Sequence, residues 1–66
     1  MTIKTVIRLQ DDVILVFDES GEQIPQYQGP YQDVKTNILR DAPPDAVFQH
    51  WFQNMAEAIV VPREHW

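Results

Sequence analysis

The segment from Ala46 to Gln53 constrains the fold of this chain more than any other, because it contains one tryptophan and two of the three phenylalanines. It is too apolar to stand in water and too long to be a turn. It contains no catalytic motif. The way in which this aromatic segment is covered therefore decides the architecture, and it bears on whether the protein acts alone.

Two interpretations of residues 45–61 compete. As a helix that begins at Asp45 and ends before Pro62, the segment places its apolar residues on one side, at a period of about 3.6 residues. As two strands at residues 47–52 and 59–61, it uses aromatic and β-branched residues, which favour strands. Two helices on a lone hairpin make a thin domain, whereas a sheet of three or more strands with an apolar face is independently stable. We therefore predict a C-terminal hairpin and keep the helix as the alternative.

The first part of the chain predicts a β-hairpin. Apolar and polar residues alternate over residues 2–10, which is typical of a strand. The expected inner side carries Ile3, Thr5, Ile7 and Leu9. Val6 is then the one apolar residue on the polar side. Asp11 and Asp12 suit a turn, and the continuous apolar run at residues 13–17 indicates a strand that is covered on both faces.

A second turn at residues 18–21 leads toward the helix of the chain. Residues 22–24 are predicted to add a short third strand before a polar linker. The helix is predicted at about residues 30–41, with Pro30 in its first turn and Pro43 beyond its end. Its apolar stripe consists of Tyr31, Val34, Ile38 and Leu39.

Together these elements predict an α+β fold in a single small domain, residues 1–66. A small antiparallel sheet, made of the N-terminal hairpin and the C-terminal hairpin, packs on one helix; the alternative is the N-terminal hairpin with two helices. A chain of this length buries only about 60% of the surface that its unfolded form exposes. Cysteine is absent, which excludes disulfides. Stability must then come from good packing or from self-association.

The charge balance is acidic, with ten Asp and Glu against five Lys and Arg and a net charge of −5. The basic residues are scattered, and such a surface repels phosphate backbones, so we expect no nucleic-acid partner. No stretch approaches the roughly 18 apolar residues that a membrane span needs, and the N-terminus lacks a signal-peptide core. A cytoplasmic protein without a membrane partner is the expectation.

Several short motifs of this chain resemble those of a group of short, uncharacterised bacterial proteins. They are a strand pair, the turn at residues 17–22, the bend at residues 43–46 (Pro-Pro-Asp-Ala) and the tail at residues 61–66 (Val-Pro-Arg-Glu-His-Trp). The chain resembles this group over its whole length. The resemblance implies no activity and no site, because no function is established for the group.

Residues that could carry chemistry are few. The chain has no glycine-rich phosphate loop and no nucleophile elbow, and its two histidines match no ligand spacing. His50 and His65 with Glu57 or Glu64 could supply a metal site, but no cluster of ligands supports one. Ser20 is explained by turn chemistry. We therefore expect no enzyme, no cofactor and no metal.

The predicted apolar surface of the sheet is the best indicator of function. As strands, residues 13–17, 47–52 and 59–61 place apolar groups on both faces, and one helix covers only one of them. We predict a non-enzymatic protein-interaction module that forms a homodimer through the uncovered sheet face. The candidate contact residues are Phe48, His50, Trp51 and Phe52, with Trp66 as an anchor. The alternative is a small-molecule or metal pocket at a subunit interface, lined by Tyr27, Tyr31, His50 and Trp51.

Overall fold

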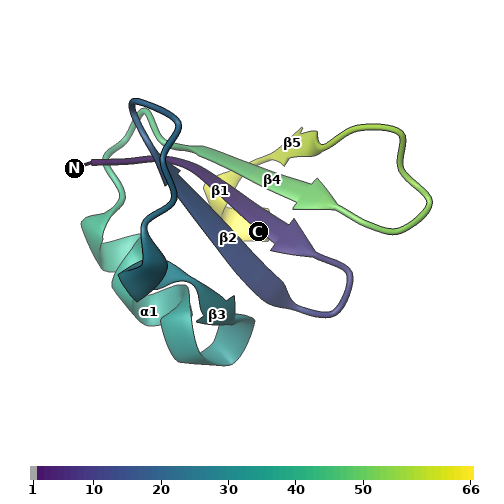
Figure 1. Cartoon of the computed structure of the whole chain (residues 1–66), viewed down its shortest axis with the longest axis horizontal. Helices are drawn as coiled ribbons and strands as arrows, with labels where there is room; N and C mark the ends of the chain where they lie inside the picture. The colour runs from purple at the N-terminus through teal and green to yellow at the C-terminus, as the bar shows by residue number, and fades with distance from the viewer. Residues whose placement is uncertain (1) are drawn as a thin grey trace.

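The computed structural model describes residues 2–66 and shows a five-stranded mixed sheet with one α-helix (Figure 1). The predicted α+β class is therefore confirmed. In chain order the elements are β1 Ile3–Leu9, β2 Val13–Asp18, the 3₁₀ turn η1 Pro25–Tyr27, β3 Gly29–Pro30, α1 Tyr31–Asp41, β4 Val47–Trp51, β5 Ile59–Val61 and the 3₁₀ turn η2 Arg63–His65. The strand interpretation of the aromatic segment is confirmed, because β4 and β5 pair as an antiparallel hairpin.

The order of the strands in space is β3-β2-β1-β4-β5, and the prediction of a purely antiparallel, four-stranded sheet is wrong. β1 pairs with β4 in parallel, with Val6 opposite Phe48 and Ile7 opposite Gln49. The reason lies in the connection between the hairpins. β3 reverses the direction of β2 and α1 reverses it again, so the chain enters β4 at the end of the sheet where β1 begins.

Two local predictions in the connecting region are corrected. Residues 22–24 form no strand; a single bridge joins Gln23 to Phe17, and the third strand is Gly29–Pro30, where a linker was expected. Gly29 has φ +141°, a conformation that side chains other than hydrogen rarely allow. Pro30 has φ −60° and ψ 138°, so it precedes the helix instead of lying in its first turn.

Ile3 lies in the core as predicted, but from Thr5 onward the inner face of β1 is the opposite of the predicted one. Ile3 pairs with Asp18 but Thr5 pairs with Phe17, so the register shifts between these two positions and the alternation changes sides. Val6, the expected exception, is fully buried against α1. Ile7 is buried too, yet it lies outside the core cluster and points to the other face.

The core lies between α1 and one face of the sheet. Its buried residues are Ile3, Val6, Ile14, Val16, Ile24, Val34, Ile38, Ala42, Phe48 and Trp66. The predicted helix stripe is confirmed, because Val34 and Ile38 are buried while Tyr31 and Leu39 pack against the cluster. Within residues 2–66, α1 falls short of the length and apolar character that a membrane-crossing helix requires.

Two turns fix the strand ends with aspartate side chains. Asp12 adopts φ +62°, and its N–H donates to the carbonyl of Leu9 at 3.0 Å. Asp18 closes the second turn, where its carboxylate accepts from the Ser20 hydroxyl at 2.7 Å and from the Glu22 N–H at 3.0 Å. These bonds, the one from the Ser20 hydroxyl first, lower the pKa of Asp18. Turn chemistry thus accounts for Ser20, as predicted.

Candidate interaction surface

The sheet has a second face that no other element covers, and we call it the open face. Strand alternation and the cross-strand pairs assign eleven residues to it: Thr5, Ile7, Leu9, Val13, Leu15, Phe17, Pro30, Val47, Gln49, Trp51 and Val60. Among the described residues, every element outside the sheet lies on the other side. Ile24, just before η1, and Trp66 at the end of η2 belong to the core cluster, and Tyr27 of η1 packs against it. The uncovered face that the sequence predicted is therefore present in the chain.

The open face is apolar and ordered in rows. Ile7 lies between Leu15 and Gln49, and Val60 lies beyond Gln49 in the same row. Neighbouring side chains bury Ile7, whereas Trp51 is 44% exposed and Val60 is 64% exposed. The exposed large hydrophobic residues of the open face, Trp51 and Val60, therefore lie on β4 and β5.

None of the described residues assigned above to the open face is charged. All five basic residues of the chain contact other groups, namely Lys4, Arg8, Lys35, Arg40 and Arg63. Arg8 shows how fully such a residue is engaged: it donates to Asp12 at 2.9 Å and to the main-chain oxygen of Trp66 at 2.8 Å. Its guanidinium carbon also lies 3.7 Å from the centroid of the Tyr31 ring. The open face thus has no cation of its own.

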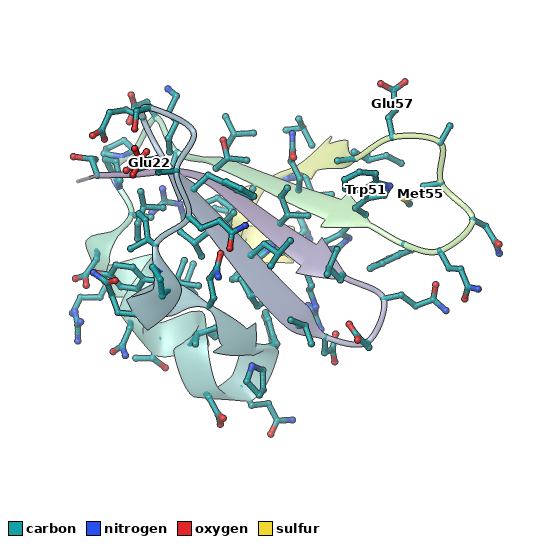
Figure 2. The ribbon with its side chains drawn as sticks, in the orientation of Figure 1. Glu22, Trp51, Met55 and Glu57 are labelled. Atoms are coloured by element: carbon teal, nitrogen blue, oxygen red, sulfur yellow. The ribbon has the colours of Figure 1, made fainter. Side chains whose placement is uncertain are left out.

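A groove of about 700 Å³ lies at one end of the open face, between the β1–β2 turn and the end of β4. Its lining is Leu9, Gln10, Asp11, Trp51, Phe52 and Gln53. The N–H of Gln53 donates to the Gln10 side chain at 2.6 Å, so this bond ties the two walls together. Figure 2 shows Trp51 and Met55 at the loop between β4 and β5, with the Glu57 carboxylate pointing outward from that loop.

The five predicted contact residues do not share one surface. Trp51 is on the open face and Phe52 lines the groove. Phe48 and Trp66 are buried in the core, where their rings meet edge to face at a centroid distance of 5.0 Å. These two residues therefore anchor their own chain and offer no surface to a partner, because parallel pairing with β1 turns Phe48 toward α1.

His50 faces the α1 side of the sheet and stacks on Phe52 at a centroid distance of 5.0 Å. Its Nε2 atom is buried without a hydrogen-bond partner among the described residues. Burial lowers the pKa of His50, and the positive charge of Arg8, its neighbour on β1, lowers it further. Both effects disfavour the protonated imidazole, which is consistent with a ring packed on Phe52.

The rival pocket does not form within one chain. His50 and Trp51 are consecutive on β4 and point to opposite faces. Tyr27 donates a short hydrogen bond to Asp41 at the end of α1, which raises the pKa of the phenol, whereas Arg40 and then Tyr27 lower the pKa of Asp41 to about 2. Among residues 2–66, no three acidic or histidine side chains are close enough together to hold a metal ion.

Sequence reasoning missed Leu9, Asp11 and Val60 as surface residues. Leu9 was expected in the core and Asp11 only in a turn. The signal for Leu9 was present in Val6, which broke the alternation and marked the register shift. Val60 could not be assigned to a face until its partner Gln49 was known.

Comparisons with known proteins return nothing: no protein-family model matches the chain, and no curated protein or solved structure is significantly similar to it. The resemblance to short bacterial proteins stays a prediction.

Proposed function

We propose that this protein is a non-enzymatic interaction module that self-associates through the open face. The observation that carries the proposal is a sheet face of eleven uncharged residues, nine of them apolar, over which no described element of the chain packs. Apolar surface of this kind is stabilised when it leaves water. A second copy provides a face of identical chemistry, and two sheets can stack at a distance of about 10 Å.

The size of the open face sets the expected strength of the dimer. Strands lie about 4.8 Å apart and rise about 3.3 Å per residue, so the five strands present a flat footprint of about 400 Å². The relief of the side chains raises the accessible area above this value. It still falls toward the small end of known interfaces, where about 800 Å² per partner is standard. We therefore expect a weak dimer, with a micromolar or higher dissociation constant.

Charge modulates this association. Each copy has a net charge of −5, and the open face contributes no ion pair that could offset the repulsion between two copies. Salt screens such repulsion over about 10 Å at 0.1 M ionic strength. Raising the salt concentration should therefore strengthen the dimer, in contrast to an interface held by ion pairs.

Sedimentation equilibrium of two neighbouring variants tests the proposal. Val60 and Ile59 are both exposed on β5, at 64% and 50%, but only Val60 belongs to the open face. Val60→Lys should abolish self-association because it places a cation on the face, whereas Ile59→Lys should leave it unchanged. A protein that is monomeric at millimolar concentration, or equal effects of the two variants, would contradict the proposal.

A subunit-interface pocket for a small molecule has less support. The residues that would line it lie on both faces of the sheet, so a single two-fold contact cannot gather them. A cytoplasmic location stays a prediction from the sequence.

A further inference from the structure

We propose that the groove at the end of the open face binds the side chain of an arginine presented in an extended segment of a partner protein. Three apolar residues form its walls, namely Leu9, Trp51 and Phe52, and two glutamines and one aspartate form its rim. This combination of an aromatic wall with one carboxylate is what an alkyl guanidinium requires. The proposal does not depend on self-association.

Asp11 supplies the charge complementarity. Asp11 is exposed. Its carboxylate oxygen Oδ1 accepts a long hydrogen bond of 3.4 Å from the N–H of Val13. Within the described part of the chain, Asp11 has no ion pair, whereas the adjacent Asp12 is paired with Arg8 at 2.9 Å. The Lys and Arg side chains of the chain contact other groups, so a cation that pairs with Asp11 would belong to another molecule.

Trp51 supplies the stacking surface. It is the most exposed aromatic residue of the open face, at 44%, and it lies opposite Leu9 in the parallel pair of β1 and β4. A guanidinium plane stacks on indole and still leaves its N–H groups free for a carboxylate at the edge of the ring. Arginine therefore fits better than lysine, whose ammonium makes a point contact.

The shape of the groove favours an arginine within a peptide segment over a free cation. The N–H of Gln53 donates to the side chain of Gln10, so these two residues of the rim hold each other in place. The groove is open along the sheet. A free arginine would leave parts of the apolar walls exposed to water. Apolar residues on either side of the arginine would instead cover Leu9 and Phe52, which adds apolar burial to the ion pair.

The test is an NMR titration of the ¹⁵N-labelled protein, at a concentration where sedimentation shows a monomer. The ligand is a short capped peptide with one arginine between two leucines. We expect shifts of the amides at residues 9–11 and 51–53 and of the Trp51 indole N–H, with weak affinity that falls with added salt. The same peptide with citrulline, a neutral isostere of arginine, should bind at least severalfold more weakly.

Matched variants separate the groove from general charge effects. Asp11→Asn keeps turn chemistry and should weaken binding about three- to fivefold, as loss of an exposed ion pair does. Glu57→Gln removes the same charge from a carboxylate outside the groove and should not weaken it. Trp51→Leu should cost a similar factor to Asp11→Asn.

Any of the following outcomes would overturn the proposal. The first is the absence of shifts around the groove, and the second is equal binding of the arginine and citrulline peptides or equal effects of Asp11→Asn and Glu57→Gln. The third is capped arginine alone binding as tightly as the peptide, because the groove would then be a site for small cations and not for a protein segment.

Discussion

Replacement of Trp66 by alanine measures how much the C-terminal segment contributes to the core. Trp66 is 4% exposed, and its ring contacts Tyr31 and Phe48 at centroid distances of 5.2 and 5.0 Å. Truncation of a buried Phe or Trp to Ala typically costs about 3–5 kcal/mol. A domain of this size is expected to have a free energy of unfolding of about 3–10 kcal/mol. Trp66→Ala should therefore lose about a third or more of its free energy of unfolding.

Two further variants show whether the loss comes from the buried ring. Trp51→Ala removes the same side chain from an exposed position and should cost about 1 kcal/mol or less. Trp66→Phe keeps an aromatic ring and deletes an indole N–H that is buried without a partner among the described residues. An unpaired buried donor costs about 1–3 kcal/mol, so its removal offsets part of the lost packing.

The assay is urea unfolding followed by far-UV circular dichroism, at low protein concentration so that self-association does not add to the stability. We expect the wild type to have the highest urea midpoint. Trp51→Ala and Trp66→Phe should lie slightly below it and close to each other, and Trp66→Ala should lie far below all three. A Trp66→Ala midpoint near that of the wild type, or an equal loss in Trp51→Ala, would refute the assignment of Trp66 to the core.

Two pH-dependent predictions follow from the titratable groups. Because burial and then Arg8 lower the pKa of His50, the stabilisation by its neutral ring is complete above the unfolded value of about 6.5 and declines as the pH falls below it. The urea midpoint should drop between about pH 7.5 and pH 5, and this drop should be smaller in His50→Gln; equal slopes would exclude His50 as the cause. Hydrogen bonds lower the pKa of Asp18, so its contribution is present above about pH 4 and declines in more acidic solution. Asp18→Asn should melt at a lower temperature than the wild type at neutral pH, and the difference should shrink toward about pH 2; a constant difference would argue against the ionised turn.

Local patterns predicted those elements whose ends and faces depend on nearby residues. α1 was placed within one residue because Pro30 precedes it and Pro43 lies beyond its end. Its apolar stripe needs no knowledge of the sheet. The strands in the aromatic segment were predicted from β-branched and aromatic residues against a clean helical period, since a sheet offers these side chains better cover than a second helix on a lone hairpin.

The remaining features depend on pairing between distant residues. The parallel contact of Val6 with Phe48 joins residues 42 positions apart, and no local pattern specifies its direction. The register shift in β1 moved Leu9 from the expected core to the groove. Trp66 was predicted to anchor a partner, and only its contacts with Tyr31 and Phe48 show that it is interior. The candidate site was therefore predicted for Trp51 and Phe52 alone.

The outermost strands of the sheet limit what its association can become. β3 has two residues and β5 has three, and each is next to or contains a proline, Pro30 in β3 and Pro62 directly after β5. Proline has no N–H to give to an added strand, and short borders offer few free backbone groups. Growth of the sheet from either border, the route to fibrils, is thus blocked while the flat side stays available. In the proposed dimer, two copies that meet on the open face would cover each other and leave no open face for a third copy.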